Sequence, residues 1–130
     1  MEARTTSGAD VTNARVLDHP DCADIRLEGV LHALSDPMRL TVVRELAAAS
    51  GELSCSDFAL PVTKSTTTHH FRVLRESGVI RQTYRGTAKM NALRQQDLET
   101  LFPGLLRSVL AADSAESGRA EEAGRPASGL

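Results

Sequence analysis

Aromatic residues are scarce in this sequence: they make up 3% of its 130 residues, and tryptophan is absent. A hydrophobic core must therefore be built from aliphatic side chains, and the length suffices for one domain with a modest core. No apolar run approaches the about 18 residues that a membrane-spanning helix needs. The N-terminus also lacks the basic and then hydrophobic pattern of a signal peptide, so we expect a cytoplasmic protein with no membrane partner.

Cysteine is also rare, since only Cys22 and Cys55 are present. Two thiols cannot form a disulfide framework, and their scarcity fits a reducing compartment. A metal or redox site that combines both thiols with His19 is an alternative, but nothing in the spacing brings these groups together. We expect Cys55 to pack as a small hydrophobe.

Catalytic patterns are missing as well. There is no supported Cys-His or Ser-His-Asp arrangement, no phosphate-binding glycine loop, and no carboxylate pair outside capping or surface positions. The sequence therefore favours a protein that is not an enzyme, and it indicates no cofactor and no metal.

Positive charge, in contrast, is concentrated in one segment. The net charge of the whole chain is −2. Residues 64–94 carry seven cations against the single anion Glu76, a net charge of +6 that leaves −8 for the remainder. The cations are Lys64, Arg72, Arg75, Arg81, Arg85, Lys89 and Arg94. A basic footprint in an otherwise acidic chain is typical of a DNA-binding surface.

The basic segment opens with a predicted amphipathic helix over residues 63–78. Thr63 is a good N-cap, and Gly78 stands where a left-handed C-cap is wanted. The buried stripe is expected to contain Thr67, Phe71 and Leu74. The opposite face offers short or cationic hydrogen-bond donors: Lys64, Ser65, Thr68, His69 and Arg72. Such a face suits close approach to a DNA major groove, although a threonine-rich surface helix is the alternative. His70 faces away from the groove side and is expected to be structural.

A two-stranded hairpin is predicted next, from residues 79–84 and 88–93 with Gly86 in the turn. Its exposed side would carry Arg81, Thr83, Arg85 and Lys89, which could meet phosphates beside the groove. The alternative is a hairpin that is basic only for solubility.

Helices are also expected before and after this segment. One begins at Asp24 and has two apolar sides, one for its own domain and one for a partner chain. A second runs from Met38 to Ala49, capped by Asp36 and Pro37, with Arg39, Arg44 and Glu45 outside. A short helix over residues 52–60 is capped by Ser54. The last begins near Arg94, breaks at Pro103, and is apolar enough to require a partner helix.

The two termini carry no apolar period. The predicted organisation is therefore a flexible N-terminal arm over 1–21, one domain over 22–112, and a disordered tail over 113–130.

Two segments resemble the ArsR/SmtB-type bacterial transcriptional regulators. Residues 31–40, Leu-His-Ala-Leu-Ser-Asp-Pro-Met-Arg-Leu, resemble the family segment "aLsdptRl". Residues 62–80 resemble the recognition segment "vsqstvShHLkvLreaGlv". The resemblance implies a mainly α, winged helix-turn-helix fold with a small β-hairpin. It also implies a homodimer, joined through the first and last helices, that represses transcription until an effector releases it from double-stranded DNA.

The expected DNA contacts divide into two groups. Groove contacts are expected from Lys64, Ser65, Thr68 and His69. Contacts to the DNA backbone are expected from Thr63, Arg72, Arg85 and Lys89.

The usual metal sites of this family are not intact in the sequence. Where metal-sensing members have two cysteines, this chain has Ser54 and Ser56, and the single Cys55 lies between them. The terminal helix has Asp97 and Glu99 but no histidine, and His32 is expected to bond between helices. Two alternatives remain open: a winged-helix protein-interaction module, and a thiol- or metal-responsive regulator that uses Cys55.

Overall fold

The computed structural model describes residues 14–58 and 60–124. The chain divides into two compact units, residues 1–95 and 96–130. Within the described part of the chain, no helix is long and apolar enough to cross a membrane.

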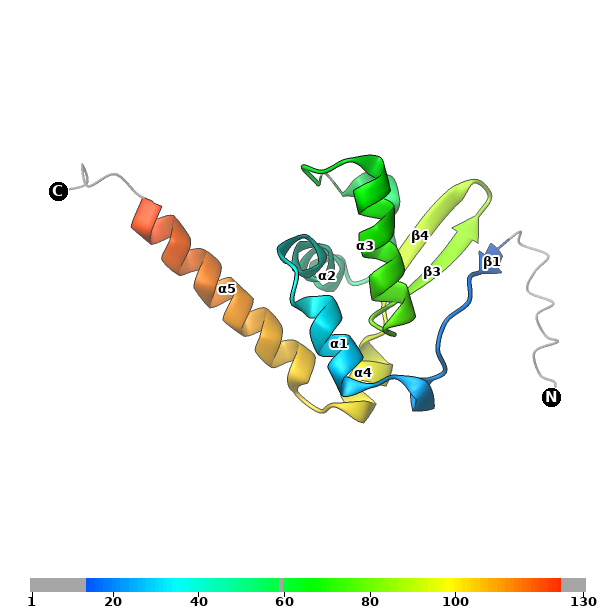
Figure 1. The fold of residues 1–130 in the computed structure, drawn as a ribbon, viewed down its shortest axis with the longest axis horizontal. Coiled ribbons are helices and arrows are strands. Elements are labelled where there is room, and N and C mark those ends of the chain that lie inside the picture. The colour runs from blue at the N-terminus through cyan, green and yellow to red at the C-terminus, as the bar shows by residue number, and fades with distance from the viewer. Residues whose placement is uncertain (1–13, 59, 125–130) are drawn as a thin grey trace. The chain divides into compact units, whose positions relative to one another are not determined.

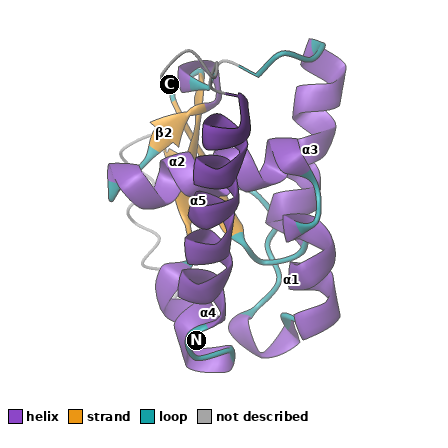
Figure 2. Ribbon diagram, turned by 90° about the vertical axis from the view of Figure 1, so that its left-hand side faces the viewer, coloured by secondary structure: helices purple, strands orange, loops and turns teal. Residues whose placement is uncertain are grey.

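The first unit combines three α-helices with a small antiparallel sheet (Figures 1 and 2). The helices are α1 (Leu27–Leu34), α2 (Pro37–Ala49) and α3 (Lys64–Glu76), and two 3-10 turns are η2 (Cys22–Asp24) and η3 (Cys55–Asp57). The strands are β1 (Ala14–Val16), β2 (Leu53–Ser54), β3 (Ile80–Arg85) and β4 (Ala88–Leu93), in the order β1-β3-β4-β2. This arrangement confirms the predicted mainly α fold with a β-hairpin wing.

The core of this unit is aliphatic, as the shortage of aromatic residues requires. The three helices contact one another, while α2 contacts β4 and α3 contacts β3. Fully buried side chains include Val30, Val42, Val43, Leu46, Leu74 and Ile80. One aromatic pair, Phe58 and Phe71, packs with ring centroids 5.4 Å apart. The core therefore fixes α3 against both α2 and the hairpin.

Local signals set the ends of α2 and α3. The Asp36 carboxylate accepts hydrogen bonds from the backbone N–H groups of Met38 and Arg39, and Pro37 occupies the first helical position. Burial alone would raise the pKa of Asp36, but these two hydrogen bonds hold it below its ordinary value, so the capping group stays ionised. Thr63 caps α3 by accepting from the Thr66 N–H at 3.2 Å.

Gly78 ends α3 in a left-handed conformation with φ of +88°. The Val79 N–H donates to the Leu74 carbonyl and the Gly78 N–H donates to the Arg75 carbonyl, which is the Schellman pattern. A Cβ atom at position 78 would lie 2.5 Å from Cγ1 of Ile25. Glycine is therefore required both by the backbone and by the close approach of the segment before α1.

The N-terminal arm is shorter than the sequence predicted. Ala14–Val16 forms strand β1, which pairs antiparallel with β3, so the expectation of a mobile arm over 1–21 is wrong for its last part. These three residues have no alternating apolar pattern, so the sequence contains no local sign of a strand. The strand forms because the edge of β3 supplies its hydrogen-bond partners. Residues 1–13 lie outside the described part of the chain.

The short helix predicted over 52–60 is also corrected. Leu53–Ser54 pairs with β4 as strand β2, and only Cys55–Asp57 winds into the 3-10 turn η3. The Ser54 backbone N–H donates to the Asp57 carboxylate at 2.8 Å, so the predicted capping position is confirmed. Phe58 is buried, whereas Leu53 and Leu60 are half-buried.

The second unit contains most of helix α4 (Gln95–Leu101) and all of α5 (Leu105–Gly124). The two helices are separated at Phe102-Pro103-Gly104, where the missing proline N–H predicted a break. The predicted disordered tail over 113–130 is wrong for residues 113–124, which are helical. Alanine and glutamate favour helix without any apolar period. Residues 125–130 lie outside the described part.

Candidate nucleic-acid interface

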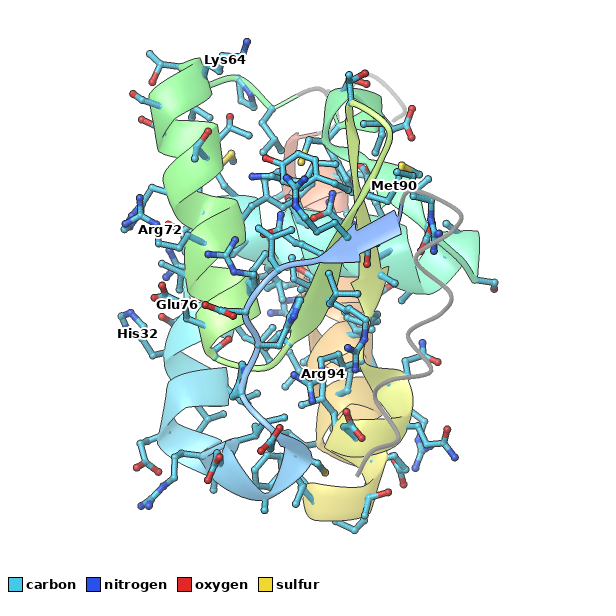
Figure 3. All side chains as sticks on the ribbon, turned by 90° about the vertical axis from the view of Figure 1, so that its right-hand side faces the viewer. His32, Lys64, Arg72, Glu76, Met90 and Arg94 are labelled. Atoms are coloured by element: carbon cyan, nitrogen blue, oxygen red, sulfur yellow. The ribbon has the colours of Figure 1, made fainter. Side chains whose placement is uncertain are left out.

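The proposed groove face of α3 is exposed along its length. Lys64, Ser65, Thr68, His69 and Arg72 are all exposed, whereas Phe71 and Leu74 are buried on the opposite side. In Figure 3, Lys64 and Arg72 point away from the body of the first unit. The donor groups that the sequence placed on one face therefore lie together in the structure, on a rigid helix.

The N-terminal end of α3 and the turn between β3 and β4 lie at the same end of the first unit (Figures 1 and 3). Thr63 is exposed at this end, but its hydroxyl also donates to the Thr66 hydroxyl at 2.9 Å. A helix N-terminus and a wing tip that point the same way can meet one DNA duplex together.

A buried arginine links the helices behind this face. Arg39 is only 7% exposed, which corrects the prediction that it lies outside. Its Nε donates to the Ala33 carbonyl at 2.8 Å, and one terminal nitrogen lies 3.3 Å from the His32 carbonyl. The other lies 3.2 Å from Nδ1 of His70 on α3. Arg39 thus caps the last turn of α1 while it also holds α3, and His70 has the structural role that the sequence predicted.

A second polar chain runs from α3 into the sheet. Arg75 donates to the Gln82 side-chain oxygen at 2.6 Å, and the Gln82 amide donates to Asn91 at 2.8 Å. The Asn91 amide in turn donates to the Leu53 carbonyl at 3.2 Å and lies 3.3 Å from Cys55 Sγ. Gln82 and Asn91 are fully buried, so these polar side chains satisfy each other inside the protein. This chain fixes the angle between recognition helix and wing.

The wing differs from the prediction in three ways. Thr83 is only 5% exposed and cannot meet phosphates. Lys89 pairs with Tyr84, so it lies on the opposite face of the hairpin from Arg81 and Arg85. Arg85 donates to both carboxylate oxygens of Glu52, at 2.8 and 2.7 Å. That pair lowers the pKa of Glu52 and leaves Arg85 less available for DNA.

His19 holds β1 against the wing. Its Nε2 accepts a hydrogen bond from the backbone N–H of Gln82 at 2.8 Å. Two residues earlier in the chain, the Leu17 N–H donates to the Gln82 carbonyl at 3.2 Å. Burial lowers the pKa of His19, and the charges of Arg81 and Arg94 act in the same direction. The neutral imidazole that accepts this bond is therefore favoured.

Neither cysteine belongs to a cluster of metal-ligating side chains among the described residues. Cys22 lies in η2 and Cys55 in η3, both half-buried and neither in a disulfide. Across residues 14–58 and 60–124, no three His, Cys, Asp or Glu side chains are placed to hold one metal ion. His32 is exposed, and its backbone carbonyl rather than its ring bonds to Ser35 and Arg39.

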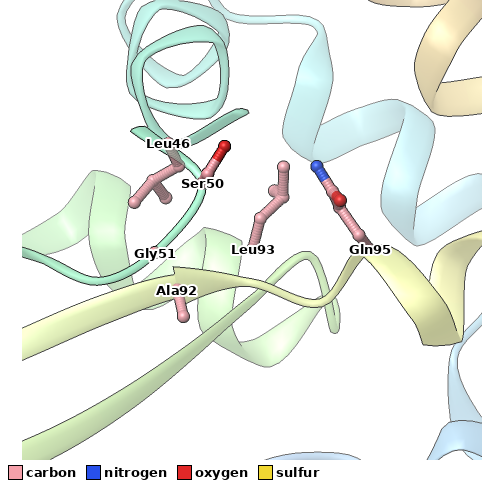
Figure 4. A pocket seen from close by; sticks show the side chains of 6 residues that line it. All are labelled: Leu46, Ser50, Gly51, Ala92, Leu93 and Gln95. Atoms are coloured by element: carbon pink, nitrogen blue, oxygen red, sulfur yellow. The ribbon is translucent and has the colours of Figure 1, made fainter. Parts of the chain in front are cut away.

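A cavity of about 290 Å³ lies between the end of α2 and β4 (Figure 4). It is lined by Leu46, Ser50, Gly51, Ala92, Leu93 and Gln95. These residues include no ionisable side chain, so the cavity offers no carboxylate, imidazole or thiolate and no acid–base group.

Comparison with known proteins agrees with this geometry. Residues 34–83 match a family model described as a helix-turn-helix domain. The chain is 33% identical over 82 residues to YceK of Bacillus subtilis (strain 168), an uncharacterized HTH-type transcriptional regulator. The match covers 62% of this chain and 82% of that protein. The chain belongs to the HTH-type transcriptional regulators.

Solved structures identify the fold of this HTH-type regulator. The crystal structure of an ArsR family transcriptional regulator superposes with a TM-score of 0.51 and 24% identity, covering 77% of this chain and 93% of that one. The transcriptional repressor BigR from Xylella fastidiosa gives 0.46 and 22%, over 78% and 97% of the two chains. Only the first score exceeds 0.5, and it confirms the predicted winged-helix fold. In this HTH-type regulator, α3 lies within the matched helix-turn-helix segment, and the β3–β4 hairpin is the wing.

Proposed function

We propose that this HTH-type regulator is a homodimeric repressor that binds an inverted-repeat operator in double-stranded DNA. The observation that carries the proposal is the exposed face of α3, where five donor side chains lie in a row on a helix held by Arg39 and Arg75. Lys64, Ser65, Thr68 and His69 are assigned to base edges in the major groove. Thr63, Arg72 and Lys89 are assigned to the DNA backbone, and Arg85 contributes there only after release from Glu52.

Unpaired apolar surface supports a dimer. Leu27 and Leu31 on α1 are 44% and 45% exposed. No residue of α5 is buried, although Leu105, Leu106, Val109 and Leu110 give it an apolar stripe. Apolar surface of this kind on both the first and last helices favours a second copy of the chain, which would place two recognition helices about 34 Å apart.

The test starts from genomic fragments captured by the full chain at low salt, which supply the operator sequence. Binding of that duplex is then measured by fluorescence anisotropy over a range of salt concentrations. For the wild-type chain, the affinity should fall steeply as salt rises, because each neutralised phosphate contributes a log–log slope of about 0.9.

Arg72→Ala should lower the affinity for operator and unrelated DNA alike and reduce the salt slope by about one, because a phosphate contact carries no sequence information. Arg26→Ala is the control, since Arg26 is another exposed arginine, lies outside the basic segment and pairs with Glu28 at 3.2 Å. Lys64→Ala should instead weaken operator binding more than unrelated DNA. A chain that captures no DNA at low salt would refute the proposed function, and an unchanged slope would remove Arg72 from the backbone role.

A further inference from the structure

A row of three side chains crosses the sheet near the wing tip. Tyr84 lies on the central strand β3, and the register places Arg15 of β1 and Lys89 of β4 directly opposite it on either side. Residues directly opposite in antiparallel strands project to the same face. The Arg15 guanidinium carbon lies 4.7 Å from the Tyr84 ring centroid, and Lys89 Nζ lies 5.5 Å from it.

Both contacts fall within the about 6 Å range of a cation–π interaction. The ring therefore lies between two like charges, one from each neighbouring strand, which repel each other in the free protein. Arg15 is exposed and Lys89 half-buried, so both can be reached from solvent. A shared anion between them would relieve the repulsion.

No acidic residue of the neighbouring strands supplies that anion. Residues 79–94 and 14–17 contain no Asp or Glu. Among the described residues, the ion pair of the wing joins Arg85 to Glu52, and none involves Arg15 or Lys89. On this face of the wing, the positive charge sits on the Tyr84 row, whereas Arg85 on the other face is paired with Glu52.

We infer that Arg15, Tyr84 and Lys89 form a phosphate-binding site on the wing, and that strand β1 supplies one of its two cations. The inference rests on the proposed DNA-binding function and adds a contact to it. Arg15 and Lys89 take a phosphate of the DNA backbone next to the groove entered by α3. Tyr84 is a positioning residue that holds both side chains extended, which reduces the rotamer entropy lost on binding.

The inference is tested with Arg15→Gln in the full chain, using the same operator duplex and anisotropy titrations. The salt slope should fall by about one, and the affinity at about 0.15 M salt should fall about fivefold, since a slope of about 0.9 per contact extrapolates to no effect near 1 M. Arg15→Lys keeps the charge and should retain the wild-type slope. This rescue separates phosphate binding from a role in folding, because a Lys cannot stack on Tyr84 as an arginine does.

Arg26→Gln serves as the matched control, and circular dichroism of each variant checks that β1 remains folded. An Arg15→Gln chain with wild-type slope and affinity would overturn the inference while the proposed function stands. So would an Arg15→Lys chain that loses as much slope as Arg15→Gln. A wild-type chain that binds no duplex would instead refute the proposed function itself.

Discussion

At the scale of single residues, His19 is the clearest case of a side chain whose protonation state is set by the fold. It must stay neutral to accept the Gln82 N–H. Burial is the main cause that lowers its pKa, a hydrogen bond with the Leu17 backbone acts in the opposite direction, and the positive charges of Arg81, Arg94 and Arg75 lower it further. Attachment of β1 to the wing is therefore coupled to pH.

The sign of this coupling follows from proton binding. Because the folded pKa of His19 lies below the ordinary value of 6.5, the unfolded chain binds the proton more tightly. The contribution of His19 to the free energy of unfolding is thus complete above about pH 6.5 and is lost as the pH falls below that value. His19→Gln keeps an acceptor that does not titrate.

We expect urea unfolding between pH 7.5 and 5.5 to show a smaller loss of stability for His19→Gln than for the wild-type chain. His32→Gln, which changes an exposed histidine on α1, is the control and should follow the wild type. Identical pH dependence in His19→Gln and wild type would show that the histidine does not couple the strand to pH.

At the scale of elements, α1, α2 and α3 are joined by one guanidinium. Replacing Arg39 by Met leaves the Ala33 carbonyl and Nδ1 of His70 without their buried partner, whereas the His32 carbonyl keeps its hydrogen bonds from Ser35. We expect the free energy of unfolding to fall by about 2–4 kcal/mol, the cost of unsatisfied buried polar groups.

The measurement is the urea midpoint at constant m value. Arg44→Met is the control, because it makes the same substitution on the exposed side of the same helix. It should change the free energy of unfolding by about 0.5 kcal/mol or less. A loss of equal size in both variants would contradict the role assigned to Arg39.

Element ends were predictable because their signals are local. Asp36, Thr63 and Gly78 each act on backbone groups within a few residues. Pro103 breaks a helix because proline has no backbone N–H. The burial of Arg39 was not predictable, because the carbonyls that satisfy it belong to another helix. Strand β1 was missed for a related reason, since its partner β3 lies almost seventy residues away in the sequence.

At the scale of the whole molecule, the exposed face of α3 followed from helical periodicity alone, and its five donors are where the pattern put them. The positions of the wing side chains could not be predicted in this way. Alternation along one strand cannot reveal the register that sends Lys89 to the face of Tyr84, nor the Glu52 carboxylate that engages Arg85 from 33 positions away. The site on the wing therefore needed coordinates, whereas the recognition helix did not.

The prediction at this scale concerns the proposed homodimer. Leu31→Glu changes a side chain that is 45% exposed in the single chain, so the monomer fold should persist. Loss of a buried leucine at an interface costs about 1.5–3 kcal/mol per subunit, so the dissociation constant should rise at least tenfold. Sedimentation equilibrium should then show a shift from twice the chain mass toward 14.0 kDa.

Val16→Glu is the control, because Val16 is another exposed apolar side chain, 55% accessible, on β1 instead of α1. The control should remain dimeric. A wild-type chain with the mass of one copy at all concentrations would refute the homodimer.

The position of β1 also matters for how this protein behaves when it is shortened. β1 and β2 occupy the two outer places of the sheet, where β1 pairs with residues 83–85 of β3 and β2 pairs with Met90 and Asn91 of β4. A version trimmed before Leu17 would uncover the amide and carbonyl groups along one side of β3. An uncovered strand edge can form hydrogen bonds with a strand of another molecule. Trimmed chains are therefore expected to associate edge to edge through β3 and to aggregate.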